Sequence, residues 1–257
     1  MIIDFNHDLS LLLVMEDMAK YDLAEDKPVS QERLALIREI AGGIAHEIRN
    51  PMTAVRGLLQ VLGSKQECSS YKGFFDIMVE ELDKTNAIIS ELLFLSSKSL
   101  INLKLHNLND IVEALQKEMN HEAAKGHGHV TVELGEVMEL VLCEAEITRL
   151  ILNMVRNGLE AMPASGTLTI KTFTDGSGVV LSIRDQGPGI DPDILGKLGI
   201  PFITTKEQAT GLGLAVCCGI AARHNATIDV DTGTSGTTFF VRFTQNIGGW
   251  PVSVLKE

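Results

Sequence analysis

Apolar residues recur at alternating spacings of three and four between positions 34 and 62, and this pattern constrains the fold more than any other feature. The residues in it are Leu34, Ile37, Ala41, Ile44, Ile48, Pro51, Val55, Leu58 and Leu62. Such spacing marks the seam of a helix that packs against partner helices. With Leu34 at position a of the heptad, His46 falls at position f, which is farthest from the seam. Pro51 lies on the seam and removes one helical hydrogen bond, so a bend is expected just after His46.

The neighbours of His46 make it a candidate nucleophile. Glu47 follows it directly and can hold one ring nitrogen protonated, which leaves the other nitrogen free to attack an electrophile. Asn50 lies four residues further on and shares the same exposed face. The alternative is an ordinary surface histidine, which is the commoner situation for an exposed histidine on a helix.

Composition limits the classes of protein to consider. A chain of 257 residues with 45% hydrophobic content can build a core, and more readily as two domains than as one. The formal net charge of −12 argues against a general nucleic-acid surface, while it leaves room for local basic contacts to a phosphorylated ligand. The longest apolar runs are far shorter than the ~20 residues that span a bilayer, and the acidic amino-terminal region does not look like a signal peptide. The cysteines (68, 143, 217 and 218) show no metal-ligand spacing and are expected to be reduced, as in a cytosolic protein.

The patterning divides the chain into three segments. Residues 1–29 are acidic and weakly patterned, as in a linker or the remnant of an upstream part. Residues 30–98 are expected to form a helical hairpin, with one helix from Ser30 to about Gly63, a turn at 64–70 and a second helix after it. The second helix carries its apolar face on Phe75, Met78, Leu82, Ile89 and Leu92. A hairpin with this much apolar surface needs a partner, and the usual solution is a dimer that forms a four-helix bundle.

Residues 99–257 mix strands and helices. Helices are expected at 108–124, 144–162 and 212–223, and strands at 103–106, 130–134, 139–142, 167–174, 179–184, 227–231 and 238–243. Residues 187–210 hold much of the glycine and proline and are expected to form a long loop. This combination favours a two-layer α/β sandwich, so that the whole chain is of the α+β class.

Two polar clusters in this second part could carry chemistry. Asn153 and Asn157 are four residues apart on one helix, and asparagine oxygens are hard ligands that suit Mg²⁺. The alternative is a pair of ordinary helix-surface amides. Asp185 ends an apolar strand before Gln186-Gly187-Pro188-Gly189, where a fixed carboxylate can accept a hydrogen bond from an exocyclic amine and the glycines allow close approach of a ligand. An ordinary turn would have the same composition.

Two further segments suit a phosphorylated ligand. Residues 201–206 (Pro-Phe-Ile-Thr-Thr-Lys) lie inside the long loop, and loops of that length in a compact domain are usually functional or disordered. Residues 210–214 (Thr-Gly-Leu-Gly-Leu) open a helix, and backbone amides at a helix amino terminus bind phosphate. The sequence contains no Gly-x-x-x-x-Gly-Lys-Ser/Thr motif, which excludes a P-loop nucleotide site.

Taken together, these segments resemble the catalytic core of a sensor histidine kinase of two-component signalling. The segment around His46 is similar to the family's phosphoacceptor box. Residues 153–157 resemble the N box, 185–189 the first glycine box, 201–206 the F box, 210–214 the second glycine box and 236–238 the terminal Gly-Thr element. The resemblance covers about residues 30–245 in the family's order and spacing, and its wording is most similar to the nitrogen-regulation and sporulation kinases.

The resemblance implies a reaction and roles for individual residues. ATP would bind in the 99–257 domain with its adenine against Asp185 and Thr237, and Asn157 with Asn153 would hold Mg²⁺ on the phosphates. The further nucleotide contacts that it implies are Gly187, Gly189, Lys206, Thr210, Gly211, Leu212, Gly213 and Leu214. Residues 187–210, called the lid segment below, would close over the nucleotide. Neutral His46, oriented by Glu47, would attack the γ-phosphate and then pass the phosphoryl group to an aspartate of a response regulator.

The resemblance also implies partners. A homodimer and the receiver domain of a response regulator are expected, and a protein inhibitor of the kinase is allowed, with neither nucleic acid nor membrane contact for this segment. The expected location is the cytoplasm, with a full-length protein that the family allows to be anchored in the cell membrane. Asn50 completes a Glu-x-x-Asn pattern that the family associates with dephosphorylation of the regulator, through an amide that orients water. The alternative is a solvated asparagine before the Pro51 bend.

Two departures from the family and two competing classes complete the interpretation. Ala209 stands where the family usually has glycine, which would lower nucleotide affinity if that position needs a positive φ, and Leu198 stands where phenylalanine is common. A related chaperone or mismatch-repair ATPase would carry a glutamate as general base where this chain has Asn153, and an amide cannot abstract a proton from water. A non-enzymatic dimeric scaffold would not need His46, Asn157 and Asp185 together.

Overall fold

The structure is a computed structural model that describes residues 48–96, 101–126, 128–176, 178–206 and 209–244. All of these residues belong to one compact unit. His46, Glu47, Ser30 and the amino-terminal part of the heptad pattern lie outside the described residues, as does the segment 1–29. Within the described parts of the chain, no helix is both long enough and apolar enough to cross a membrane.

The first part of the structure is the helical hairpin that the heptad pattern predicts. Residues 48–63 are helical, with Pro51 in their first turn, and α3 runs from Lys72 to Ser96. The connection contains the 3₁₀ helix η1 (Gln66–Tyr71), which the sequence had not indicated. The amide of Lys65 donates to the carbonyl of Leu62 and the amide of Cys68 to the carbonyl of Lys65, each over 3.1 Å, and such bonds between residues three apart are those of 3₁₀ turns at a helix end.

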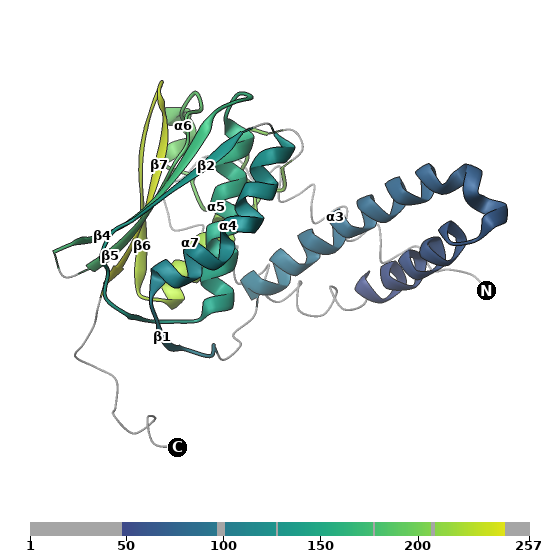
Figure 1. The fold of residues 1–257 in the computed structure, drawn as a ribbon, viewed down its shortest axis with the longest axis horizontal. Coiled ribbons are helices and arrows are strands. Elements are labelled where there is room, and N and C mark those ends of the chain that lie inside the picture. The colour runs from purple at the N-terminus through teal and green to yellow at the C-terminus, as the bar shows by residue number, and fades with distance from the viewer. Residues whose placement is uncertain (1–47, 97–100, 127, 177, 207–208, 245–257) are drawn as a thin grey trace, which may run out of the picture. The chain divides into compact units, whose positions relative to one another are not determined.

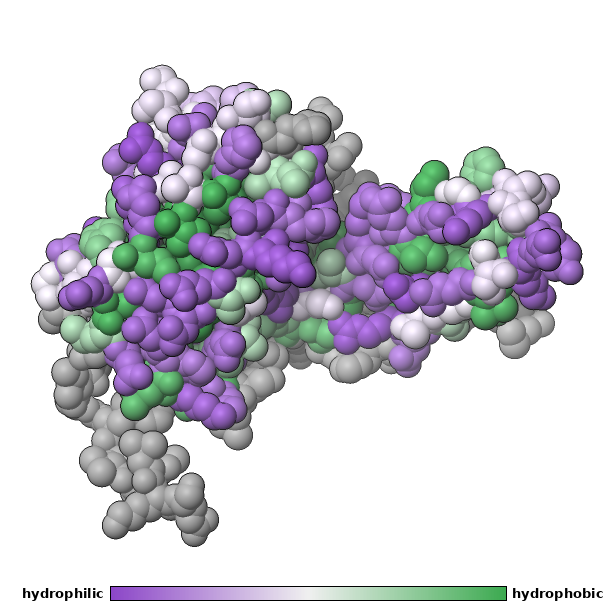
Figure 2. All heavy atoms as spheres, viewed as in Figure 1, coloured by the Kyte–Doolittle hydropathy of each residue, from purple (hydrophilic) through white to green (hydrophobic). Residues whose placement is uncertain are grey.

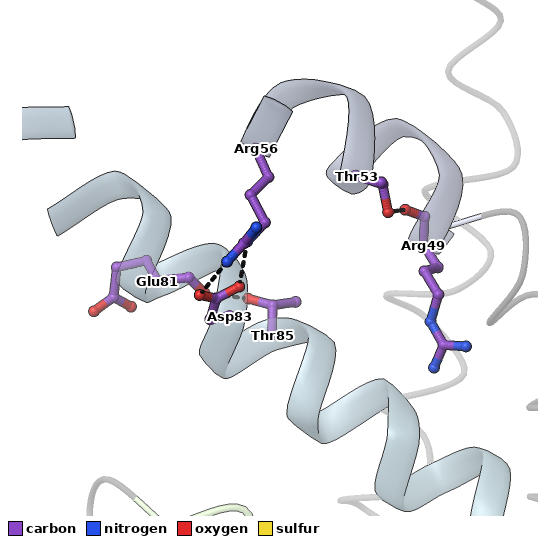
Figure 3. A network of polar contacts seen from close by, with 6 residues as sticks. All are labelled: Arg49, Thr53, Arg56, Glu81, Asp83 and Thr85. Atoms are coloured by element: carbon purple, nitrogen blue, oxygen red, sulfur yellow. Dashed lines mark hydrogen bonds and ion pairs between the residues drawn. The ribbon is translucent and has the colours of Figure 1, made fainter. Parts of the chain in front are cut away.

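Polar side chains join the two helices of the hairpin (Figure 3). Arg56 donates two hydrogen bonds to the carboxylate of Asp83, over 2.7 Å from Nε and 3.2 Å from Nη2. Arg49, one turn before Thr53 on the same helix, donates to Oγ of Ser90 over 3.0 Å. Both partners of the Arg56–Asp83 pair are solvent-accessible, so the pair fixes the register of the helices more than it stabilises them.

Much of the apolar surface of the hairpin is exposed in a single chain. The side chains concerned belong to Val55, Leu58, Val61, Leu62, Phe74, Ile77 and Met78. Figure 2 shows hydrophobic patches on this part of the molecule. Leu58, which the heptad pattern places on the seam, is 64% exposed. An apolar surface of this kind marks an interaction site, which agrees with the predicted need for a partner.

The second part, residues 101–244, is called the sheet domain below. Its main sheet has the strand order β2-β4-β5-β7-β6, and β2 pairs with β4 in parallel while the other neighbours are antiparallel. The strands are β2 (His129–Leu134), β4 (Thr167–Asp175), β5 (Gly178–Arg184), β6 (Ala226–Gly233) and β7 (Gly236–Thr244). A separate two-stranded ribbon joins β1 (Lys104–His106) to β3 (Leu140–Leu142).

One face of this sheet is covered by helices, as Figure 1 shows. They are α4 (Leu108–Lys125), α5 (Glu144–Ala161) and α7 (Gly213–Arg223). Each buries an apolar stripe against the strands, and Leu150, Ile170 and Val241 are fully buried in the resulting core. The arrangement confirms the predicted two-layer α/β sandwich and the α+β class.

The lid segment contains one short helix, α6 (Pro192–Leu195), where the sequence predicted only loop. Its start has a clear local cause, because the side chain of Asp191 accepts a hydrogen bond from the amide of Asp193 over 2.9 Å. Pro192 takes the first helical position, where its missing amide hydrogen costs nothing. A helix of one turn is too short to leave a periodic pattern in the sequence.

Candidate functional site

A cavity of about 760 Å³ lies between the carboxyl end of α5, the end of β5 and the lid segment. Most of the residues that the sequence singled out line it. Those residues are Asn153, Asn157, Asp185, Gly189, Lys206, Thr210, Gly211, Gly213, Leu214 and Thr237. The fold thus brings together side chains that are up to 84 positions apart, from Asn153 to Thr237.

The side chain of Asp185 is buried and held in place by backbone hydrogen bonds. The residue is only 4% exposed, and its Oδ1 accepts hydrogen bonds from the amides of Gly187 and Thr237 over 2.8 and 3.0 Å. Its own amide donates to the carbonyl of Thr237 over 2.9 Å. Two charge-assisted backbone bonds hold the carboxylate rigidly at the floor of the cavity.

Glycine is required at two positions where backbone segments come close together near Asp185. Gly236 has a φ of +128°, and a Cβ atom there would lie 2.1 Å from the carbonyl oxygen of Asp185. Gly189 has a φ of +87°, and its Cβ would lie 2.4 Å from the carbonyl oxygen of Gly233. Neither position tolerates a side chain, which explains the glycines at the start of β7 and after Asp185.

The two asparagines of α5 face the amino terminus of α7. The amide nitrogens of Asn153 and Asn157 each lie 4.0 Å from the place that a Cβ of Gly213 would occupy. Asn153 is 9% exposed and donates to the carbonyl of Gly213 over 3.4 Å. These amides therefore stand beside the backbone N–H groups of the first turn of α7, an arrangement that suits phosphate oxygens and a hard cation.

The lid segment is held to the start of α7 by backbone geometry. Gly211 has a φ of +68°, and its carbonyl accepts a hydrogen bond from the amide of Phe202 over 3.2 Å. A Cβ at Gly211 would lie 2.7 Å from the carbonyl carbon of Phe202, so only glycine fits. Phe202 itself has a positive φ of +66°. The lower nucleotide affinity expected from Ala209 stays a prediction.

Charged side chains surround the mouth of the cavity. Nζ of Lys206 lies 2.8 Å from Oε2 of Glu160 and 3.3 Å from the carbonyl oxygen of Asn157. Thr210 donates to Oε2 of Glu91 over 3.4 Å, and burial raises the pKa of the Glu91 carboxyl above its usual range. Both acidic residues line the cavity.

Several predicted residues lie elsewhere. Gly187 and Leu212 are not part of the described lining: Gly187 is buried beside Asp185, and Leu212 is fully buried in the apolar core. Asn50 is exposed on the hairpin, in agreement with the predicted face. His46 and Glu47 fall outside the described residues, so their placement stays a prediction.

Glu160, Thr232 and Glu91 are among the residues of the site that were not predicted from the sequence. Glu160 belongs to the same helix face as Asn153 and Asn157, so the spacing of three from Asn157 could have indicated it. Thr232 accepts a hydrogen bond from the amide of Ile190 over 2.9 Å and lies 3.0 Å from Oγ1 of Thr237. Thr232 thereby helps to hold Ile190 and Thr237 in place. No local sequence pattern marks either Thr232 or Glu91.

The site has no cluster of acidic, histidine or cysteine ligands. Among the described residues, no group of three or more such side chains could hold a metal ion. The donors that the sequence predicts for a cation are the amide oxygens of Asn153 and Asn157, which leave most coordination positions to ligand phosphates and water. That donor set fits Mg²⁺ bound together with a polyphosphate and does not fit a resident zinc or iron.

Comparison with known families agrees with this geometry. Residues 143–247 match the family described as "Histidine kinase-, DNA gyrase B-, and HSP90-like ATPase". Residues 36–100 match the family described as "His Kinase A (phospho-acceptor) domain". The two matches together include the described hairpin residues 48–96 and all the residues that line the cavity.

Among curated proteins, the chain is 32% identical to Sporulation kinase C of Bacillus subtilis (strain 168), over 85% of this chain and 53% of that protein. It is 35% identical to Sporulation kinase D of the same organism, over 78% of this chain and 40% of that protein. The chain therefore spans about half the length or less of these relatives. The predicted similarity to the sporulation branch is confirmed.

Among solved structures, the histidine kinase ThkA in complex with the response regulator protein TrrA superposes with a TM-score of 0.60 at 25% identity, over 84% of this chain and 64% of that one. The structure of full-length ShkA in complex with AMPPNP superposes with a TM-score of 0.69 at 21% identity, over 84% of this chain and 46% of that one. Both share the fold of the hairpin followed by the sheet domain. With both domain matches in order along the chain, this protein belongs to the sensor histidine kinase family.

Proposed function

We propose that this protein is an ATP-dependent histidine kinase that phosphorylates itself on His46 and passes the phosphoryl group to an aspartate of a response regulator. The observation that carries the proposal is the cavity itself. It combines a rigid buried carboxylate on Asp185, a pair of asparagines and the open amino terminus of α7. The match to an ATPase family over residues 143–247 supports the same reading.

The carboxylate of Asp185 would recognise adenine. The hydrogen bonds described for it both end on Oδ1, so Oδ2 is the atom we assign to the exocyclic amine of the base. A carboxylate accepts but does not donate, which selects an amine over a carbonyl at that position of the purine. Thr237, held by Thr232, would complete the contact.

The phosphates would lie between α5 and the first turn of α7. Backbone amides at Gly213 and Leu214 would donate to phosphate oxygens, with Lys206 reaching in from the lid segment. Asn157 and Asn153 would hold a Mg²⁺ ion, which when bound neutralises charge on the β- and γ-phosphates. Asn153 stands where the related ATP-hydrolysing families carry a glutamate as general base, and its amide cannot abstract a proton from water, which disfavours hydrolysis as the main activity.

Phosphoryl transfer would then need only a positioned nucleophile. The unprotonated ring nitrogen of His46 attacks the γ-phosphorus while the bond to the β,γ-bridging oxygen breaks and ADP leaves with that electron pair. Glu47 orients the ring by accepting a hydrogen bond from the other nitrogen. Because ATP is the donor, we place this reaction in the cytoplasm.

The exposed apolar face of the hairpin supports a homodimer in the same proposal. Its seven large side chains form a surface that a second copy of the hairpin would cover, as a four-helix bundle requires. The response regulator as phosphoryl acceptor is supported by the likeness to ThkA, which was solved in complex with a response regulator protein.

The decisive experiment incubates the protein with γ-labelled ATP and Mg²⁺ and then tests the label for stability. A phosphohistidine survives alkali and is lost in acid. His46→Gln should take up no label while it binds Mg-ATP as the wild type does. Full labelling of that variant, or a label that resists acid, would refute the assignment.

A second experiment addresses the nucleotide site by calorimetry with Mg-AMPPNP. Asp185→Asn should weaken binding roughly tenfold to a hundredfold, because a buried charge-assisted hydrogen bond contributes about 1.5–3 kcal/mol. Asp110→Asn is the matched control, since Asp110 is exposed on α4 away from the cavity lining. Equal affinity of both variants would remove Asp185 from the site.

A further inference from the structure

An ion pair at the mouth of the cavity has no role in the reaction described so far. Glu160, in the last turn of α5, accepts a 2.8 Å hydrogen bond from Nζ of Lys206 in the lid segment. The same Nζ lies 3.3 Å from the carbonyl oxygen of Asn157. Lys206 is therefore drawn onto the end of α5, on the side where the phosphates of a nucleotide would lie.

The charges around the cavity show why this pairing matters. Its lining carries three cationic side chains, on Arg156, Lys197 and Lys206. A nucleotide triphosphate brings about four negative charges and needs such groups. Two of these cations already have an anionic partner: Nε of Arg156 lies 3.8 Å from Oε2 of Glu122, and Lys206 is paired with Glu160. Of these two partners only Glu160 lines the cavity, so it is the one that a phosphate must replace there.

The Lys206–Glu160 ion pair is weak enough for Lys206 to change its partner. The side chains of Lys206 and Glu160 are 36% and 55% exposed, and ion pairs at that exposure are weak and screened by salt. A phosphate group presents more charge and more acceptor oxygens than a carboxylate does, so it can take over the lysine at little cost.

We propose that Glu160 is a positioning residue that competes with the nucleotide phosphates for Lys206. This inference rests on the proposed function, because it assumes that the cavity binds an adenine nucleotide. Without nucleotide, Glu160 fixes Lys206, near the carboxyl-terminal end of the lid segment, against α5. On binding, Lys206 changes partner from Glu160 to phosphate, and when the nucleotide leaves, Glu160 takes the lysine back.

The test is a calorimetric series with adenosine, ADP and AMPPNP in the presence of Mg²⁺. Glu160→Gln should bind ADP and AMPPNP about two- to fivefold more tightly than the wild type, the range that loss of an exposed competing ion pair allows. Adenosine has no phosphate, so its affinity should not change. The advantage of the variant should shrink at high salt.

Two further variants separate competition from other causes. Glu144→Gln removes the same charge from an exposed position in the first turn of α5, and it should match the wild type with all three ligands. In a Lys206→Gln background, Glu160→Gln should give no gain, since no lysine remains to compete for.

Each alternative has its own result. A change in adenosine affinity equal to that for AMPPNP would show a structural effect of Glu160 and overturn the inference. A gain that persists without Lys206 would mean general repulsion of phosphate by Glu160, which also overturns it. A wild-type protein that binds none of the three ligands would refute the proposed function as well, whereas normal wild-type binding with an unchanged Glu160→Gln would refute the competition alone.

Discussion

The hairpin exposes large apolar side chains of a kind that the sheet domain buries. Leu58 of the hairpin is 64% exposed, while Leu150 on α5 of the sheet domain is completely buried. Both leucines lie on helices with an apolar stripe. The sheet domain therefore completes its core within one chain, whereas the hairpin presents an interface that needs a second chain. Stability within the sheet domain is an intramolecular property, and that of the hairpin depends on protein concentration.

The largest effect is expected from a substitution inside the sheet domain, which should behave as a single-chain core. Gly236→Ala places a Cβ atom where the carbonyl oxygen of Asp185 lies and forces alanine into a φ of +128°. We expect a loss of about 3 kcal/mol or more in the free energy of unfolding and loss of nucleotide binding. Urea denaturation measures the first effect. A loss below about 1 kcal/mol would show that β7 can move away from Asp185.

A charge on the hairpin should separate the chains without unfolding the sheet domain. Leu58→Asp should weaken the dimer by about a hundredfold or more, because an unpaired charge buried in the bundle costs roughly 3 kcal/mol. Phosphorylation of His46 should fall with it, while Mg-AMPPNP affinity stays unchanged. Sedimentation across a concentration series gives the dimer constant.

The control for that experiment is Leu105→Asp. Leu105 lies on β1 of the sheet domain and is 61% exposed, so its exposure matches that of Leu58. It should leave the dimer intact. If both variants behave alike, or if the wild-type chain is monomeric at micromolar concentration, the exposed apolar residues of the hairpin are not an interface.

Asn50 tests whether the hairpin carries chemistry beyond His46. Asn50→Ala should still label His46 and still donate to the regulator, but its rate of regulator dephosphorylation should fall by roughly tenfold, as expected when an amide that orients water is lost. Gln60→Ala, an exposed amide on the same helix, is the matched control. A parallel fall of kinase and phosphatase rates would make Asn50 structural.

The smallest expected effect has the opposite sign. Gly73 lies exposed in the first turn of α3, and a Cβ there meets no atom within 4 Å. Gly73→Ala should therefore stabilise the helix by about 0.5–1 kcal/mol, through the lower entropy of the unfolded chain. Thermal unfolding of the dimer would show it, and destabilisation instead would indicate a close neighbour across the dimer.

Sequence patterns predicted the strands and the long helices well, including the three-residue strands β1 and β3, but missed two short helices. The helix expected at 108–124 is α4 (Leu108–Lys125), and the strand expected at 167–174 is β4 (Thr167–Asp175). These elements are long enough for their burial pattern to repeat. The 3₁₀ helix η1 and the one-turn helix α6 are too short to repeat anything, so they were missed.

The residues of the candidate site also differ in how well the sequence predicted them. Asp185, Asn157 and Gly213 were recognisable because each belongs to a local pattern of residues. Contacts between distant segments left no such pattern: Oε1 of Gln186 accepts from the amide of Thr167, and Glu91 contacts Thr210 across 119 positions. Such contacts depend on tertiary packing, which no window of sequence contains.

The position of β7 in the sheet has a consequence for the order of synthesis. β7 (Gly236–Thr244) is the last described strand, yet it lies between β5 and β6 and hydrogen-bonds to both. Until the ribosome has made it, β5 and β6 have no common neighbour and Thr237 is missing from Asp185. The hairpin, whose contacts are local, can form much earlier. A nascent chain would therefore expose the apolar face of its hairpin while its sheet domain is still incomplete. Loss of a few residues before Thr244 would also be more harmful than their distance from His46 suggests, because it would shorten β7.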